Sequence, residues 1–222
     1  MESWSNKVTS EDVMSQIDKG LGPKTWSPIF KELIKCTPPN SIVNFDLLWR
    51  DPQPSWTSPH SRVIQIGDSA HTFLPASGNG ATQAIEDAIS LASCLQLGGK
   101  DKIEEAVQAH VRFRFTRVVC AQKLGFANAE ILQDTDWERV PTDPKKAHPR
   151  HPKWTWEHDV EKYTYENYEE NVEAMKEGVR FDESHVPPNY PPGYRYEPWS
   201  IDDIMERMKK GESVDLGSGD WR

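Results

Sequence analysis

Two short stretches in the first third of the chain have hydrophobic patterns that predict strands. Between residues 43 and 49 the hydrophobic residues fall on every second position, as Val43, Phe45, Leu47 and Trp49, which is the period of a half-buried strand. Residues 62–66 form a shorter run that is rich in β-branched residues and ends at a glycine, as expected for a strand buried in a sheet that helices cover. The two runs predict an α/β fold.

A different period begins at residue 80. Hydrophobic residues then recur at intervals of three and four until the Gly98-Gly99 pair, which predicts a helix over about 80–97. The same kind of pattern, with suitable caps, predicts further helices over 9–18, 101–131, 165–176 and 200–210. Ser200, with Asp203 three residues on, is expected to cap the last of these. The sequence therefore predicts long helices beside its short strands.

The loop between the second strand and the helix at residue 80 carries the most specific chemistry. Asp68 follows the strand, at the edge where open α/β sheets bind ligands, and its carboxylate accepts hydrogen bonds from hydroxyl groups. Pro75 fixes the loop backbone, whereas Gly78 and Gly80 let that backbone approach a ligand with no Cβ in between. Free N–H groups at the helix start favour a negatively charged ligand atom. Taken alone, Asp68 also suits a turn or a helix cap, so the interpretation depends on the whole motif.

The whole motif is similar to one found in a known family. It reads Gly67-Asp68-Ser69-Ala70-His71, then Pro75, Gly78-Asn79-Gly80 and Glu86-Asp87-Ala88. It resembles the second flavin motif of the FAD-dependent aromatic hydroxylases, which are class A flavoprotein monooxygenases, and especially their fungal salicylate-hydroxylase-like branch. The resemblance extends from about Lys24 to Gly125, and Ser69 stands where the family usually has alanine.

The resemblance implies roles for individual residues. In the family, the aspartate binds the ribityl chain of FAD, which implies that role for Asp68. The proline lies along the isoalloxazine ring, which implies Pro75. The backbone amides that face the pyrimidine edge of the flavin correspond to Gly78, Asn79, Gly80 and Ala81. NAD(P)H is then the expected co-substrate, and O2 supplies the oxygen transferred to a small aromatic or polyketide-like metabolite of secondary metabolism. No catalytic residue is assigned.

One half of the family pattern has no counterpart in this sequence. The family's βαβ fold with a Gly-x-Gly-x-x-Gly turn, which holds the FAD pyrophosphate, is not matched. We therefore expect an incomplete FAD-binding fold from the C-terminal portion of such an enzyme. Residues 1–60 would be a remnant of the substrate-domain sheet and helices, 61–133 the C-terminal part of the FAD-binding domain, and 134–222 an arm.

Two functions from different classes stay open. The first is an FAD-dependent monooxygenase whose other half comes from an upstream exon or a partner chain, or which works as a homodimer. The second is a truncated, non-catalytic remnant that acts as a binding or interaction module. Loss of the pyrophosphate contacts favours the second function for the chain alone, because charge-assisted hydrogen bonds are strong.

Charge and proline are unevenly distributed. Residues 134–222 hold 21 of the 35 Asp and Glu residues, 9 of the 17 prolines and 5 of the 9 tryptophans. This composition predicts an extended, loosely structured arm whose aromatic residues act as anchors. The whole chain has a net charge of -9 and a pI near 5.3, which argues against a nucleic-acid partner because such proteins need surplus Lys and Arg.

Several further features narrow the class of protein. The sequence has no run of about 18 apolar residues and no signal-peptide pattern at its start, so we expect a cytoplasmic protein without a membrane span. Three widely spaced cysteines predict neither a disulfide framework nor a zinc site. The histidines at 148, 151 and 158, with Asp159, fit no compact ligand set, so no metal is expected.

The charged residues near the motif have structural alternatives. His71 is expected to pack beside the loop rather than act as a base. Glu86 and Asp87 are neighbours on a helix and point to different sides, which predicts salt bridges or helix-end electrostatics rather than an acid/base pair. One arginine of the next helix is expected to be a buried carboxylate partner and the others solvated. The candidates are Arg112, Arg114 and Arg117.

Overall fold

The computed structural model describes residues 4–20, 27–45, 48–133, 140–142 and 148–222. The chain divides into two compact units, Met1–Leu48 and Trp49–Arg222. The smaller unit contains α1 (Ser10–Gly20) and α2 (Pro28–Lys35), and Lys31 of α2 pairs with Asp18 of α1 at 2.6 Å. Helix α1 begins where the sequence predicts. The backbone N–H of Thr9 donates to the carboxylate of Asp12, and the N–H of Asp12 donates to the Thr9 hydroxyl, which satisfies donors at the helix start.

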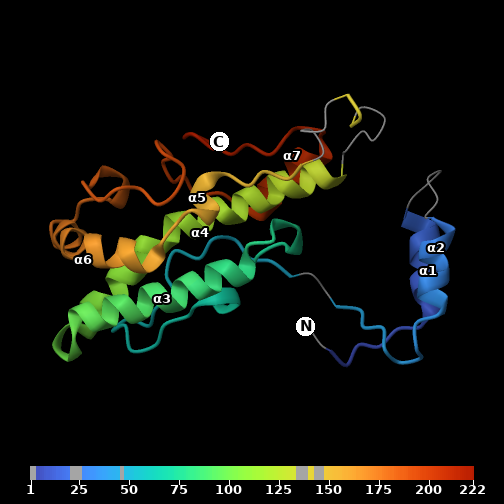
Figure 1. Ribbon diagram of the computed structural model, residues 1–222, viewed down its shortest axis with the longest axis horizontal. Coiled ribbons are helices and arrows are strands. Elements are labelled where there is room, and N and C mark those ends of the chain that lie inside the picture. The colour runs from blue at the N-terminus through green and yellow to red at the C-terminus, as the bar shows by residue number, and fades with distance from the viewer. Residues whose placement is uncertain (1–3, 21–26, 46–47, 134–139, 143–147) are drawn as a thin grey trace. The chain divides into compact units, whose positions relative to one another are not determined.

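The larger unit is built on a hairpin of two long helices. Helix α3 (Gly80–Gly98) turns through η3 (Lys100–Lys102) into α4 (Ile103–Gln133), and the two helices lie side by side (Figure 1). Their close approach depends on Gly98. A Cβ there would lie 2.9 Å from the Cβ of Ala106 and 2.8 Å from the hydroxyl of Tyr168. The glycine pair predicted to end α3 therefore also brings the helices together.

The C-terminal arm covers the second half of α4. It contains α5 (Lys153–Trp156), α6 (Val160–Lys176), η5 (Phe181–Glu183) and α7 (Ile201–Lys209), and in Figure 1 its orange and red segments run along α4. Tyr190 and Tyr194 pack with Cys120 of α4, while Ile201 packs with Phe126. As a result, every residue of α4 from 117 to 129 is buried.

The predicted looseness of this arm is wrong for residues 148–222. Most of the aromatic anchors bury, as the sequence indicated, although Trp156 and Tyr165 stay exposed. Helices α6 and α7 form where helices were predicted. Ser200 caps α7 by accepting a hydrogen bond from the N–H of Asp203 at 3.1 Å. The prolines prevent regular backbone hydrogen bonding in the arm, but they do not prevent the arm from packing on α4. The core formed by the aromatic side chains therefore holds an irregular backbone in place.

The helix predictions are confirmed, but the strands and the α/β class are not. Backbone pairing in the described residues consists of two isolated antiparallel bridges, Lys7 with Val43 and Thr57 with Ile64. Within the run 62–66, Val63 is 65% exposed. A strand is stable only beside hydrogen-bonded neighbours, and the described part of the chain supplies no set of them, so the alternating pattern forms a bridge instead of a sheet.

Helix α2 was not predicted, although Pro28 in its first turn is a favoured start for a helix. Among the described residues, no helix combines the length and the apolar character needed to span a bilayer.

Candidate cofactor site

The six residues that the sequence singled out for cofactor binding line one cleft. It has a volume of about 460 Å³, within the range usual for small-molecule sites. The cleft is lined by Asp68, Pro75, Gly78, Asn79, Gly80 and Ala81, together with Phe73, Leu74, Ser77 and Ala84. Phe73, Leu74, Ser77 and Ala84 were not predicted, although they lie within the same motif in the sequence. Asp68 is the one titratable residue among these lining residues, so the cleft can bind and orient a ligand but offers no acid/base pair.

The first wall of the cleft is a single 3-10 turn, η1 (Gly67–Ser69). Gly67 has φ +57° and a Cβ there would lie 3.1 Å from the Cβ of Ala84, so both conformation and space favour glycine. The N–H of Gly67 donates to the Asp87 carboxylate at 2.9 Å, and Nε2 of His71 lies 2.6 Å from the same carboxylate. The turn is thereby fastened to α3 at both ends, and Asp68 between them is left exposed.

The second wall is the turn η2 (Pro75–Ser77) with the glycine that follows it. Gly78 has φ +62° and a Cβ built there meets no atom within 4 Å, so its missing side chain leaves open space in the cleft. Ser77 packs against α4 at Gly125, where a Cβ would lie 2.7 Å from the Cβ of Ser77. The Gln122 side chain donates to the Thr72 carbonyl at 2.8 Å. Helix α4 thus supports the loop from behind.

The floor of the cleft is the N-terminus of α3. Its N-cap residue, Asn79, makes no side-chain cap to the helix, and its Nδ2 donates back to the Ser77 carbonyl at 2.8 Å. Within the described residues, the N–H groups of Gly80, Ala81 and Thr82 have no hydrogen-bond acceptor. Free donors and the positive end of the helix dipole therefore meet in the cleft, which favours an electron-rich ligand atom.

A buried ionic network lies beneath this floor. Arg114 is fully buried and donates to both Glu86 and Asp87. Burial alone would raise the pKa of Asp87, but hydrogen bonds from His71 and the charge of Arg114 outweigh it and hold that pKa well below its usual value. Burial likewise opposes ionisation of Glu86, yet Arg117 and Arg114 keep its pKa lowered. Both carboxylates are therefore charged and structural.

More arginines of α4 are buried than the sequence predicted. Arg117 is also fully buried, and it holds Glu86 through two hydrogen bonds of 2.7 and 2.8 Å. Arg112 is half-buried and donates to the Asn171 side chain and the Val179 carbonyl. The prediction of one buried arginine is thus wrong, because two carboxylates on α3 and several carbonyls of the arm provide partners for more than one. The salt bridges predicted for Glu86 and Asp87, and the packing of His71 beside the loop, are confirmed. The two carboxylates do not point to different sides of α3, however, because both reach Arg114.

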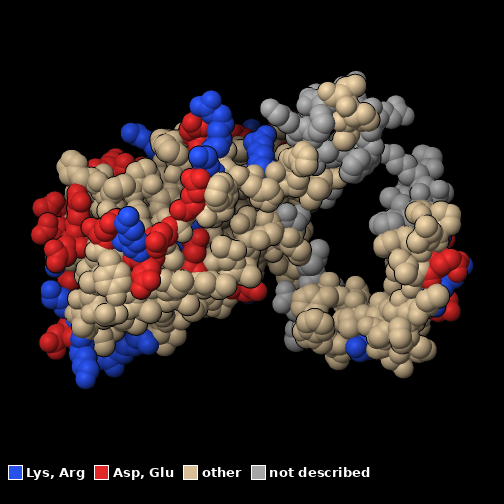
Figure 2. Space-filling model, in the orientation of Figure 1, with Lys and Arg blue, Asp and Glu red and all other residues tan. Residues whose placement is uncertain are grey.

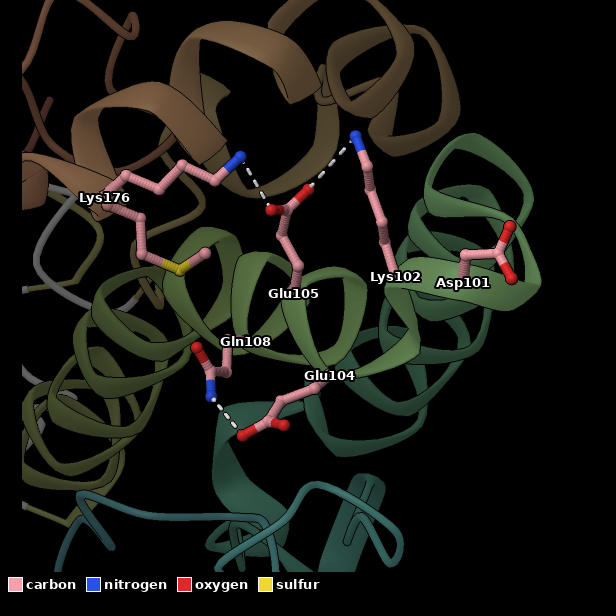
Figure 3. Close-up of a pocket in the computed structure, with 7 residues that line it drawn as sticks. Asp101, Lys102, Glu104, Glu105, Gln108 and Lys176 are labelled. Atoms are coloured by element: carbon pink, nitrogen blue, oxygen red, sulfur yellow. Dashed lines mark hydrogen bonds and ion pairs between the residues drawn. The ribbon is translucent and has the colours of Figure 1, made fainter.

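Two other cavities of about 410 Å³ are less suited to a cofactor. One lies between the start of α4 and the end of α6 (Figure 3), where Glu105 pairs with Lys176 at 2.7 Å and with Lys102 at 4.0 Å. Glu105 is thus already paired with lysines, and Gln108 donates to Glu104 at 3.4 Å. The other is lined mainly by apolar groups around Trp56 and Phe115. Among the described residues, no group of three or more His, Cys, Asp or Glu side chains is placed to hold a metal ion.

Comparison with known proteins identifies the relatives of this chain. No family model matches it. It is 42% identical to the FAD-dependent monooxygenase fsr3 of Gibberella fujikuroi and 41% identical to the FAD-dependent monooxygenase mdpD of Emericella nidulans, in both cases over 99% of this chain. The chain spans only 41% and 42% of these relatives.

Solved structures give the same result for the fold. The crystal structure of CtdE in complex with FAD and a substrate matches 79% of this chain at 32% identity with a TM-score of 0.67. The crystal structure of FqzB matches 85% at 27% identity with a TM-score of 0.69. The chain covers 41% and 43% of these two proteins. The resemblance to FAD-dependent monooxygenases is therefore confirmed, and this chain spans less than half of the length of each of these proteins.

Proposed function

We propose that this chain, whose relatives are FAD-dependent monooxygenases, supplies the part of an FAD site that holds the flavin ring edge and the ribityl chain. One observation carries the proposal. An exposed carboxylate, a glycine with open space in place of a side chain and an uncapped helix N-terminus all face one cleft. This combination suits a ligand that has hydroxyl donors beside an electron-rich ring edge.

The residues fit the parts of such a ligand. Asp68 would accept hydrogen bonds from ribityl hydroxyls, since a carboxylate is an acceptor with two oxygens. The N–H groups of Gly80 and Ala81 would donate to the carbonyl oxygens of the flavin pyrimidine ring and stabilise negative charge there, with dipoles oriented before any reaction. Pro75 would lie along the ring, and Gly78 would leave the space that the ring edge needs.

The reaction proposed is a hydroxylation or oxidation of a small aromatic or polyketide-like metabolite. Bound FAD would supply its redox chemistry, with electrons from NAD(P)H and the oxygen atom from O2. This chain's own contribution is to position the flavin edge, to bias it electrostatically through the start of α3, and to exclude water with Phe73 and Leu74. The lining residues of the cleft provide no acid/base pair, since Asp68 is the one titratable residue among them.

The second candidate function is a binding module without turnover. The observation that favours it is that the chain spans less than half of the relatives it matches. The sequence holds no Gly-x-Gly-x-x-Gly turn between a strand and a helix, so contacts to the FAD pyrophosphate would have to come from elsewhere. In that case the cleft would bind a flavin weakly, and no NAD(P)H would be oxidised by the chain alone.

Flavin binding by the purified 222-residue chain tests the proposal. FMN and FAD should bind with affinities within about tenfold of each other, because the contacts proposed lie on the ring and the ribityl chain, which both contain. Asp68→Asn should weaken both by about 10-fold or more, since a hydrogen bond to a charged group is worth about 1.5 to 3 kcal/mol. Asp101→Asn, which changes an exposed carboxylate away from the cleft, is the matched control.

The possible outcomes separate the candidates. No binding of FMN at millimolar concentration, or equal binding by the Asp68→Asn variant, contradicts the proposed site. Binding with flavin-dependent oxidation of NADH or NADPH supports the enzyme, whereas binding without oxidation supports the module. Absorbance of the flavin and of the nicotinamide distinguishes these results.

A further inference from the structure

Helix α3 buries polar side chains and exposes apolar ones. Its buried residues are Gln83, Glu86, Asp87, Ser90, Ser93 and Cys94. Its only charged residues are Glu86 and Asp87, and both lie in the network with Arg114. This is the reverse of a surface helix, whose charged residues normally face water.

The outward face of α3 is uncharged along its length, and most of its exposed side chains are apolar. Ile85 is 62% exposed, Ile89 37% and Leu95 36%. Ala81, Ala88 and Ala92 on the same face are exposed too. We call these six residues the α3 stripe. Scattered apolar residues are normal on a protein surface, but a contiguous uncharged face on one helix marks an interaction site.

Helix α6 of the same unit does not share this property. Helix α6 exposes Glu161, Lys162, Glu166, Glu169 and Glu170 and buries Val160, Tyr168 and Val172, which is the ordinary arrangement. Figure 2 shows charged side chains gathered over α6 and around the turn between α3 and α4, whereas uncharged surface predominates along α3. The outward face of α3 therefore differs from that of α6, which carries the charged residues of an ordinary surface helix.

The α3 stripe is continuous with the candidate cofactor cleft. Ala81 belongs to both, and Ala84 in the next turn also lines the cleft. A polypeptide that covers Ile85 and Ile89 would lie beside the ligand in the cleft. It could then contact the ligand from the side that this chain leaves open.

We propose that the α3 stripe is the docking surface for the polypeptide that completes the flavin site. This polypeptide corresponds to the part of the monooxygenase relatives that this chain does not match, so the inference rests on the proposed function. More than half of the length of the Gibberella fujikuroi relative is unmatched. The stripe is uncharged and apolar, which suits an apolar partner surface. The alanines of the stripe would let the backbone of the partner come close to α3. A second copy of this chain would cover the stripe but bring no new flavin contacts.

Co-expression tests the docking without relying on flavin. The tagged 222-residue chain is produced together with the unmatched part of the Gibberella fujikuroi relative, and the ratio of the two polypeptides after purification is measured. The test variant is Ile85→Glu/Ile89→Glu. The matched control is Leu132→Glu, a residue of α4 that is 48% exposed and lies outside the stripe. Circular dichroism of each variant alone checks that its helices are retained.

We expect a stoichiometric complex with the unchanged chain and with the control. The double variant should bind at least about 100-fold more weakly, because it would bury two unpaired carboxylates. No complex with the unchanged chain, or equal complexes with both variants, overturns the proposal. A dimer of the chain alone that Ile85→Glu/Ile89→Glu dissociates, seen by sedimentation, also overturns it in favour of self-association. A complex that forms through the stripe but retains no flavin contradicts the proposed function and leaves the docking intact.

Discussion

Nε2 of His71 lies 2.6 Å from Oδ2 of Asp87, and both side chains are buried. The same carboxylate also accepts from the backbone N–H of Gly67 and from Nε of Arg114. One side chain on α3 therefore holds both ends of the turn that presents Asp68, and it neutralises a buried guanidinium. The histidine of the motif serves the shape of the cleft rather than its chemistry.

Replacing Asp87 with asparagine should destabilise the larger unit by about 3 kcal/mol at pH 7. Arg114 would keep Glu86 but lose its second charge partner while buried, and breaking a buried ion pair costs about 3 to 5 kcal/mol. Urea unfolding followed by circular dichroism measures the change. Asp101→Asn, at an exposed carboxylate that has no partner among the residues drawn in Figure 3, should change stability by less than about 0.5 kcal/mol.

The same variant should alter the pH dependence of stability. The pKa of Asp87 is lower in the folded state than in the unfolded chain, so its ionised form contributes stability above about pH 4 and loses it as the pH falls further. The unchanged protein should therefore lose more stability on acidification than the Asp87→Asn variant, and their unfolding curves should converge at low pH. Parallel curves from pH 7 to pH 3 would contradict this role.

Much of the local structure around the cleft could be predicted from the sequence. The caps at Thr9 and Ser200, the limits of α3 and the gathering of Asp68, Pro75 and Gly78 follow from rules that act within a few residues. The sheet could not be predicted correctly in this way, because an alternating pattern indicates a strand only when other segments pair with it. Gly125 was missed for a similar reason, since its contact with Ser77 joins residues far apart in the chain.

Gly125→Ala should displace the η2 turn. The new Cβ would lie 2.7 Å from the Cβ of Ser77, and overpacking of this kind costs about 1 to 3 kcal/mol. Flavin affinity should fall as well, because Ser77 lines the cleft. Ser77→Gly removes the opposing Cβ, so the cost of Gly125→Ala in that background should be smaller by about 1 kcal/mol or more. Additive effects in this double-mutant cycle would show that the contact does not limit the turn.

Substitutions of Gly78 should separate folding from ligand binding. Gly78→Ala is expected to cost about 1 to 2 kcal/mol because an alanine is strained at φ +62°. Gly78→Asn should cost less, since asparagine tolerates this conformation better. Either side chain would project into open space in the cleft, so both variants should lose flavin affinity. Retained affinity in the Gly78→Asn variant would show that the ligand does not use this part of the cleft.

Arg117→Lys should loosen the arm while leaving the helix hairpin folded. Nη1 of Arg117 donates to the carbonyls of Trp154 and Asn189 at 2.6 and 2.7 Å, while Nε and Nη2 hold Glu86. A lysine carries a single ammonium group and cannot reproduce this fork, so buried carbonyls of the arm would lose their donor.

Hydrogen exchange localises this effect. The amides of Thr155 and Glu157, which close the α5 turn, should exchange at least about tenfold faster, whereas amides in the middle of α3 should change less, because local opening requires less free energy than global unfolding. Arg180→Lys is the control, because Arg180 is exposed and pairs only with the nearby Asp182 among the hydrogen bonds described. Uniform acceleration across α3, α4 and the arm would mean that Arg117 supports the whole unit, and unchanged exchange at Thr155 would mean that the aromatic anchors hold the arm without it.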